Sequence, residues 1–373
     1  MKQTLFILIF YCALNGYAQL FDNDQNTALV KTGVGYVYNM QQDSAAIYID
    51  SLEILMPLHP VVPLMKAMNV LWSSMPNVTE DSTFKIFTGH LYEAIRMAER
   101  IDGGRQEHPE AIFFEITARG LLAEYYADGD YYMKALTEAG KAYNLLRSVF
   151  QLTQENPEFY LPAGVYNYFR EMYPKKHPSY KPLLWFFRSG DAKLGISQIK
   201  EACKTAVLTK VEAYIYLSYI YLRYEEIPEL AQSYLLELCE LYPNNHYVVS
   251  KYLESLEGGG DFDKAPLEMI DQLLSVDKVY YLRAGYMFKG LYEEKVNHTF
   301  SEAKLNYQKS IRLIDNGELG RDHILSLAHL GMSRIFMHEE DIDKSIYHAK
   351  EALSFSAIEE TKQEAKAILY RLE

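Results

Sequence analysis

Residues Gly190–Ser197 read GDAKLGIS and come close to a phosphate-binding loop. Two glycines stand five residues apart and a serine ends the stretch, but Ile196 occupies the place of the lysine that would reach the phosphates. Such a loop also follows a strand, and no strand–helix–strand pattern surrounds this one. We therefore interpret Gly190 and Asp191 as a turn between two helices.

Other residue types that perform catalysis or hold metals lack the necessary spacing. His338 has no second histidine four residues away, and the pair Glu294 and His298 has no further ligand beside it. A Gly-x-Ser-x-Gly nucleophile motif does not occur in the sequence. We expect no enzyme activity, no cofactor and no metal; an enzyme without a recognisable motif is the alternative that stays open.

The first 18 residues are typical of a signal peptide. An apolar run of ten residues follows an early lysine, and Gly16 and Ala18 are the small residues expected before a cleavage point at Gln19. The run is too short to span a membrane, and Cys12 lacks the small preceding residues of a lipid-anchor site. We expect an exported protein that is periplasmic, outer-membrane-associated or secreted in a Gram-negative-type bacterium, with no membrane span and no lipid anchor.

The net charge argues against some classes of partner, and the cysteine content indicates whether disulfides stabilise the fold. The net charge is −13, which argues against nucleic acid and anionic membrane surfaces as main partners. Beyond the signal peptide only Cys203 and Cys239 remain, too few for a domain stapled by disulfides. We expect both to be buried free thiols, with a bridge between them as the alternative.

The chain contains an internal repeat. Four stretches begin with a turn, usually Gly-Asp, and place a small residue five or six positions later, with further apolar or small residues at helical spacing. The small residues of these stretches are Ala135, Gly195, Ala265 and Ser345. Small residues on one helical face let a second helix approach closely, so the pattern predicts repeated helix–turn–helix units.

In its order of large, small and aromatic positions the repeat resembles the tetratricopeptide repeat. One copy consists of Gly33, Tyr36, Ala45, Ile49, Leu52 and Pro57, and another of Leu122, Ala123, Tyr126, Ala135, Ala139 and Ala142. The resemblance implies an all-α, right-handed solenoid of about seven to eight repeats, in which the first helices line a concave wall that binds a protein or peptide. Residues 359–372 are expected to form a C-terminal capping helix.

Residues 158–182 depart from the repeat because they contain several prolines and many tyrosines. We expect an irregular insertion there, which separates repeats over 19–157 from repeats and the capping helix over 183–373. The segment from Tyr166 to Lys176 concentrates aromatic and cationic residues in this insertion.

Seven residues are candidates for a binding surface. The family pattern turns first-helix positions such as Glu124 toward the concave wall, and arginines in an acidic chain suit carboxylate or aromatic ligands. For the tyrosines the alternative is helix packing, for Glu124 a solvated carboxylate, and for the arginines an internal ion pair. The candidates are Glu124, Tyr166, Asn167, Arg170, Arg188, Tyr219 and Arg223.

Of these seven, we expect Glu124, Tyr166, Arg170, Tyr219 and Arg223 to share one concave surface. The sequence therefore favours an exported scaffold that binds a protein or peptide partner. Binding of a small ligand or oligosaccharide in an aromatic groove is the alternative, although only Trp72 and Trp185 supply the indole rings that sugars prefer.

Overall fold

The computed structural model describes residues 20–372 except 22, 77–80, 186, 314–321 and 357. The predicted signal peptide over residues 1–18 lies outside this range. Within it the chain forms seventeen α-helices and four short 3-10 helices, and none of the described residues lies in a strand. The all-α prediction is confirmed.

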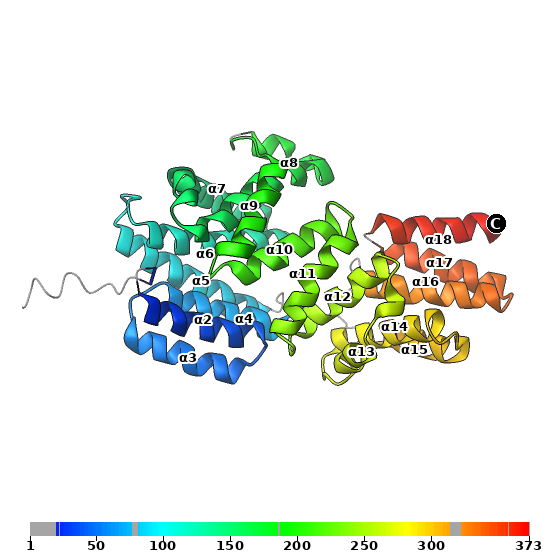
Figure 1. Ribbon diagram of the computed structural model, residues 1–373. Helices are drawn as coiled ribbons and strands as arrows, with labels where there is room; N and C mark the ends of the chain where they lie inside the picture. The colour runs from blue at the N-terminus through cyan, green and yellow to red at the C-terminus, as the bar shows by residue number, and fades with distance from the viewer. Residues whose placement is uncertain are drawn as a thin grey trace, which may run out of the picture. The chain divides into compact units, whose positions relative to one another are not determined.

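Consecutive helices pack side by side as hairpins (Figure 1). Eight hairpins followed by one further helix confirm the predicted solenoid of helix–turn–helix repeats. The hairpins are α2 (Asp24–Tyr38) with α3 (Gln42–Leu55), α4 (Val61–Ser74) with α5 (Asp81–Asp102), α6 (Pro109–Asp128) with α7 (Tyr132–Val149), α8 (Tyr160–Lys176) with α9 (Ala192–Thr205), α10 (Lys210–Arg223) with α11 (Pro228–Leu241), α12 (His246–Gly258) with α13 (Leu267–Leu274), α14 (Val279–Lys295) with α15 (Phe300–Arg312), and α16 (His323–His338) with α17 (Ile342–Phe355).

The chain divides into two compact units, which are described separately below. Unit 1 is Met1–Tyr216 and unit 2 is Leu217–Glu373. The division therefore falls within α10, whereas the sequence predicts a break at residues 158–182.

Residues 158–182 are more regular than the sequence predicts. Most of them form α8, which packs closely along α9 as an ordinary hairpin. The prolines are tolerated because of their positions: Pro162 lies in the first turn of α8, where no intrahelical N–H bond is needed, and Pro174 lies in its last turn. The irregular part is confined to the flanking 3-10 helices Pro157–Phe159 and Pro178–Leu184.

The turn predicted at Gly190 and Asp191 is confirmed. Helix α9 begins at Ala192, and the Asp191 side chain caps it by accepting a hydrogen bond of 2.9 Å from the backbone N–H of Leu194. No phosphate loop is formed, because the stretch is the entry into a helix that follows another helix.

Gly195 lets α9 approach α8 at backbone distance. A Cβ atom on Gly195 would lie 2.6 Å from the backbone nitrogen of Tyr168 and 2.7 Å from the carbonyl oxygen of Gly164. Neither of these backbone atoms can move away without shifting α8. The small residue predicted from the repeat pattern is thus required by the helix packing.

We expect Gly195→Ala to lower the free energy of unfolding by about 1–3 kcal/mol, because it overpacks the α8–α9 contact. Gly89 on α5 is the matched control, since a Cβ atom there meets nothing within 4 Å. Gly89→Ala should raise stability by about 0.5–1 kcal/mol through helix propensity. Urea unfolding of both variants checks this; equal effects of the two would contradict the packing argument.

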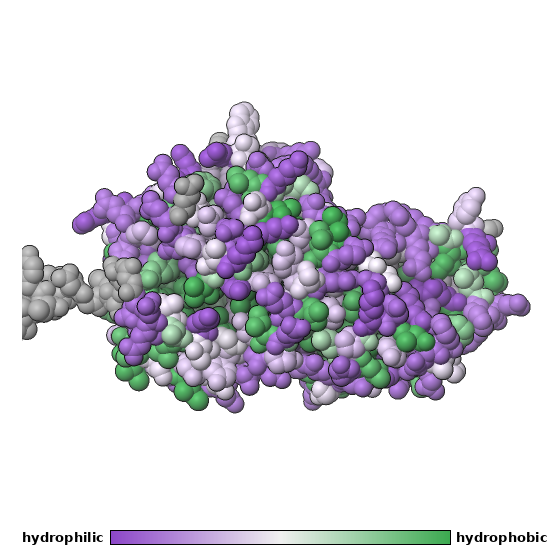
Figure 2. All heavy atoms as spheres, viewed as in Figure 1, coloured by the Kyte–Doolittle hydropathy of each residue, from purple (hydrophilic) through white to green (hydrophobic). Residues whose placement is uncertain are grey.

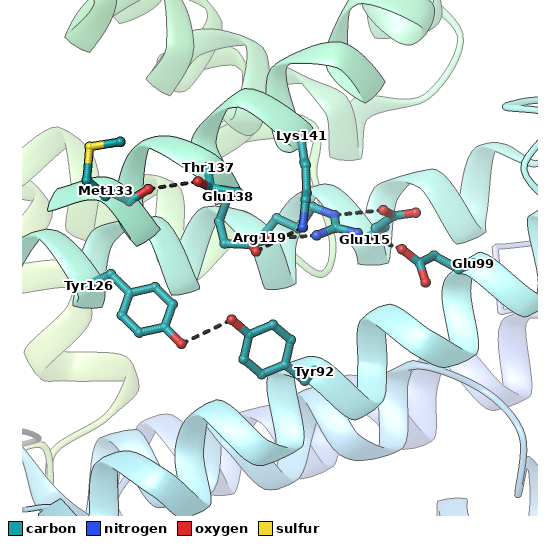
Figure 3. A network of polar contacts seen from close by, with 9 residues as sticks. All are labelled: Tyr92, Glu99, Glu115, Arg119, Tyr126, Met133, Thr137, Glu138 and Lys141. Carbon is teal, nitrogen blue, oxygen red and sulfur yellow. Dashed lines mark hydrogen bonds and ion pairs between the residues drawn. The ribbon is translucent and has the colours of Figure 1, made fainter. Parts of the chain in front are cut away.

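Hairpin α6/α7 is joined to α5 by a buried ion network around Arg119 (Figure 3). The Arg119 guanidinium donates to Glu115 on α6 at 2.7 Å, to Glu138 on α7 at 2.6 Å and to Glu99 on α5 at 2.7 Å. Arg119, Glu115 and Glu138 are all buried. Lys141 adds a further ion pair to Glu138 at 3.2 Å.

The C-terminal end of unit 2 is closed by α18 (Glu359–Leu372), as predicted for a capping helix. Its Ala365 and Ile368 join a buried apolar cluster with residues of α16 and α17. Ser345, at the small position of the last repeat, is fully buried. Cys203 of unit 1 and Cys239 of unit 2 are buried thiols that form no disulfide, as expected.

Candidate ligand-binding site

Unit 1 contains a cavity of about 480 Å³. Its wall comes from α2, α4, α6, α8 and α10, which are the first helices of five successive hairpins, and from α7. The repeat pattern predicts that first helices line a concave wall, and these five do line the cavity; that the wall binds a ligand stays a prediction. Its volume lies in the range of about 300–1,000 Å³ that is typical of small-ligand pockets.

Most of the cavity wall is apolar. Val34 of α2, Leu64 and Met68 of α4, and Leu161 and Val165 of α8 contribute aliphatic surface. Aromatic rings of tyrosine and phenylalanine complete the lining, whereas neither tryptophan contributes to it. Trp72 is buried beside Tyr38 and Trp185 is exposed elsewhere.

Helix α7 lines the cavity with residues that the repeat pattern assigns to helix packing. In α17 the corresponding Ala349 and Ala352 are fully buried, but in α7 Ala139 and Ala142 are only partly covered and face the cavity. In this hairpin the buried contact between the two helices includes the ion pair of Arg119 and Glu138. The two alanines contribute apolar surface to the cavity wall instead.

One corner of the cavity is polar and is centred on Arg170 of α8. The Nη2 group of Arg170 donates to the carbonyl oxygens of Leu184 and Phe187, at 2.7 and 3.2 Å, and its buried Nε has no hydrogen-bond partner among the described residues. The rings of Tyr143 and Tyr166 stack beside it with centroids 4.9 Å apart.

The hydroxyl groups of this corner are already engaged by the backbone of Arg188. The Tyr166 hydroxyl donates to the Arg188 carbonyl oxygen at 2.5 Å, and the Tyr143 hydroxyl accepts from the Arg188 N–H at 2.9 Å. Burial raises the pKa of Tyr166, so its hydroxyl stays protonated. The two tyrosines are therefore fixed parts of the wall, and Arg170 supplies its charge.

The carboxyl group in the lining belongs to Glu212 of α10. It accepts a hydrogen bond of 2.6 Å from Tyr38, and burial raises its pKa. Glu124 of α6 accepts a bond of 2.6 Å from Tyr216, which also lines the cavity. Protein atoms around Glu124 weaken its hydration and raise its pKa to about 7, although its side chain keeps contact with solvent.

The structure thus places the sequence candidates of unit 1 in different roles. Tyr166 and Arg170 line the cavity, and Glu124 is linked to it through Tyr216. Asn167 is buried and donates to Gln198 at 2.7 Å, so it joins α8 to α9. Arg188 contributes through its backbone, while its guanidinium lies 6.0 Å from the Phe150 ring.

Tyr219 and Arg223 belong to unit 2, so a surface shared with the unit 1 candidates stays a prediction. Arg223 forms an ion pair with the buried Glu254, which Lys251 also contacts at 2.9 Å. The two cations lower the pKa of Glu254 despite its burial. Arg223 therefore makes the internal ion pair that was the alternative to ligand binding.

Unit 2 also holds a pair of histidines between α16 and α17, of which His329 is buried and His348 is half-buried. The Nδ1 atoms of His329 and His348 are 2.9 Å apart, and Phe355 stacks on His329. Burial, with the neighbouring His348 as a second cause, lowers the pKa of His329 to about 4. Burial also lowers the pKa of His348.

Because of these histidines, we expect the free energy of unfolding to fall in mild acid. Between about pH 6.5 and 4 the unfolded chain binds a proton at His329 that the folded chain does not bind, so acid favours unfolding. We expect His329 to account for about 2 kcal/mol of the stability lost from pH 7 to pH 5. Unfolding of wild type and His329→Phe at both pH values measures this; an equal pH dependence of the two proteins would contradict it.

Sequence reasoning missed most of the cavity wall, including all residues of α2 and α4. A partial signal was present, because apolar residues extend beyond one face of the helix in α4, VVPLMKAMNVLWSS. A helix with so wide an apolar surface is covered on more than one side, by protein or by ligand. Gly120 of α6 was also missed; it lines the cavity, and a Cβ atom there would meet nothing within 4 Å.

A second apolar surface of unit 1 lies on the outer side of α3. Apolar residues gather over this helix at the lower left of Figure 2, where Ile47, Ile54 and Leu55 are exposed. Unlike the cavity it has no wall around it. Exposed apolar patches of this kind often mark protein contacts.

Two kinds of site are not found in the described part of the chain. No group of three or more histidine, cysteine, aspartate or glutamate side chains is arranged to hold a metal ion within the described ranges. Across the same residues, no helix combines the length and apolar character that crossing a bilayer demands.

The chain is similar to solved structures of low sequence identity. Yeast Tom70 covers 84% of this chain at 18% identity with a TM-score of 0.40, and the chain spans 64% of that structure's length. The C-terminal part of a TPR repeat-containing protein from Cytophaga hutchinsonii covers 75% of the chain at 14% identity with a TM-score of 0.41, and the match includes 96% of that structure. No family model and no curated protein matches. The tetratricopeptide-like character of the chain rests on its own eight hairpins and their buried small residues.

Proposed function

We propose that the protein is an exported binding protein rather than an enzyme, and that the cavity of unit 1 holds the apolar part of its ligand. The cavity itself carries this proposal. The cavity is open to solvent, as the exposure of Gly120 in its lining shows, and its wall is largely apolar. Concave apolar surfaces of this size are typical ligand sites, and an apolar body that fills one removes its wall from water. A cavity of about 480 Å³ lined by the first helices of five successive hairpins therefore favours a ligand that fills it.

A segment of a partner protein is the first candidate ligand. The concave side of helical repeats is where such scaffolds commonly hold partners, and the exposed apolar residues on α3 offer further contact area. If the signal peptide is cleaved as predicted, the partner meets the protein outside the cytoplasm.

A small apolar molecule is the second candidate, and the composition of the wall favours it. Sugars need many hydrogen-bonding groups and prefer indole rings, but no tryptophan lines this cavity. The hydroxyls of Tyr38, Tyr143, Tyr166 and Tyr216 are already hydrogen-bonded within the protein. The oligosaccharide alternative therefore finds little support here, whereas an apolar molecule fits.

Filling the cavity tests the proposal. Gly120→Leu places a side chain into open space in the cavity and should raise helix stability, since glycine is a poor helix former. Gly89→Leu on α5 is the matched control, with the same open space but outside the lining. We expect Gly120→Leu to weaken binding of a neutral apolar dye such as Nile red at least tenfold, and Gly89→Leu to leave it unchanged.

The same pair of variants tests the partner protein. A partner captured by wild type and Gly89→Leu but lost by Gly120→Leu would place that partner at the cavity. Equal dye binding by all three proteins would show that the cavity is not a ligand site, and the proposal would then be wrong.

A further inference from the structure

Arg170 differs from the other well-covered arginines because its charge is not compensated. Arg119 of unit 1 contacts three carboxylates, and Arg334 of unit 2 contacts Glu294 and Glu364. No carboxylate among the described residues lies within ion-pair distance of Arg170; the neighbouring Glu171 pairs with Lys175 at 2.8 Å. A guanidinium at an apolar wall without a counter-ion is costly unless a ligand supplies one.

The hydrogen bonds of Arg170 hold its guanidinium in place and leave donor capacity on Nη1. Nη2 donates to the carbonyl oxygens of Leu184 and Phe187, Nε is covered by protein atoms, and no hydrogen bond from Nη1 is found among the described residues. A carboxylate that reaches Nη1 would accept a charge-assisted hydrogen bond there. The Tyr143 and Tyr166 hydroxyls beside it already bond to the backbone of Arg188 and do not compete for the same group.

The charges of the lining also orient an anion. Arg170 attracts it, whereas Glu212, the carboxyl group of the lining on α10, repels it when ionised. Between them lie aliphatic side chains of α2, α4 and α8 that offer no hydrogen bonds. A ligand with one anionic end and an otherwise apolar body therefore satisfies every part of the wall.

We infer that the cavity binds a long-chain carboxylate, with its carboxylate on Arg170 and its alkyl chain along the aliphatic wall. This inference rests on the proposed function and selects its second candidate. A peptide segment fits less well, because each of its residues brings an N–H and a C=O group that need partners when buried, and this wall offers almost none. The alkyl chain has no such groups.

Titration of the purified protein with dodecanoate and with dodecan-1-ol, by displacement of Nile red, tests the inference. Wild type should bind the carboxylate about ten- to hundredfold more tightly than the alcohol, as expected for a charge-assisted hydrogen bond. Octanoate should bind more weakly than dodecanoate by about fourfold per methylene removed.

Three variants locate the effect. Arg170→Gln should lower dodecanoate affinity to that of the alcohol while changing alcohol affinity less than threefold, and Arg170→Lys should keep most of the preference. Arg96→Gln, an exposed cation of α5 outside the cavity, should behave as wild type. A thermal melt of each variant checks that it is folded.

The outcomes separate this inference from the proposed function. A carboxylate preference that survives in Arg170→Gln would overturn the inference. So would equal binding of carboxylate and alcohol by wild type, provided that Gly120→Leu abolishes the binding. Either result would still leave the cavity as a ligand site. Capture of a partner polypeptide that depends on Gly120 and is not displaced by dodecanoate would do the same. If no apolar probe binds to wild type, both the inference and the proposed function are wrong.

Discussion

Arg119→Ala is expected to lower the free energy of unfolding by about 3–5 kcal/mol. The substitution leaves Glu115 and Glu138 buried without the cation that both contact, and it removes the link to Glu99 on α5. Desolvated carboxylates then repel one another across the contact of α6 and α7. Burial already raises the pKa of Glu115, and loss of the guanidinium would raise it further. Chemical denaturation at pH 7 measures the loss.

Lys141→Ala is the matched control for Arg119→Ala. Lys141 contacts Glu138 as well, at 3.2 Å, but its side chain is half exposed. Exposed ion pairs contribute about 0–1 kcal/mol, so this variant should be close to wild type. If the two variants lost equal stability, the network would not hold the three helices together as described.

Glu158→Ala is expected to cost about 2–4 kcal/mol, the second-largest effect on stability. The buried Glu158 carboxylate accepts hydrogen bonds from the backbone N–H groups of Val207, Leu208 and Thr209, at 2.7–3.0 Å, and from the Thr209 hydroxyl at 2.9 Å. These N–H groups directly precede α10, where a negative charge is also favourable to the helix dipole. Removing the carboxylate leaves these three N–H groups and the Thr209 hydroxyl without their acceptor.

Glu155→Ala provides the comparison for Glu158→Ala, because Glu155 is exposed and its side chain makes no hydrogen bond among those of the described residues. It should change stability by less than about 0.5 kcal/mol. Glu158→Gln, which keeps one acceptor oxygen, should fall between the two. Thermal and urea unfolding can rank the three variants; a different order would contradict the capping role.

Local pattern was sufficient to predict the hairpins. Gly195 and Ser345 recur at the same place in their repeats, and both are buried where a second helix approaches. The turn at Asp191 was predictable because its side chain caps the helix that starts at the next residue. Each of these features depends on residues within a few positions of one another.

Features that join distant residues could not be predicted in the same way. Glu158 binds N–H groups about 50 residues later in the chain, and Glu110 accepts from the N–H groups of Leu20 and Phe21 about 90 residues earlier. Nothing in the local sequence of these glutamates marks them as caps of another segment. Proline content misled the prediction for α8 because the position of Pro162 in the first turn matters more than the number of prolines.

The candidate site was predicted in part. Tyr166 and Arg170 were selected for their chemistry and do line the cavity, but the wall from α2 and α4 depends on how five hairpins curve around a common space. That curvature arises from packing between repeats, as at the ion pair between Arg119 of α6 and Glu99 of α5, and leaves no motif in the sequence.

Hydrogen exchange of the purified protein, with and without saturating dodecanoate, tests the central claim most directly. The account predicts slower exchange in the segments of α6, α8 and residues 178–188 that surround Arg170, with Gly120→Leu showing no such change. Protection confined to unit 2, or equal protection in wild type and Gly120→Leu, would contradict the assignment of the cavity as the ligand site.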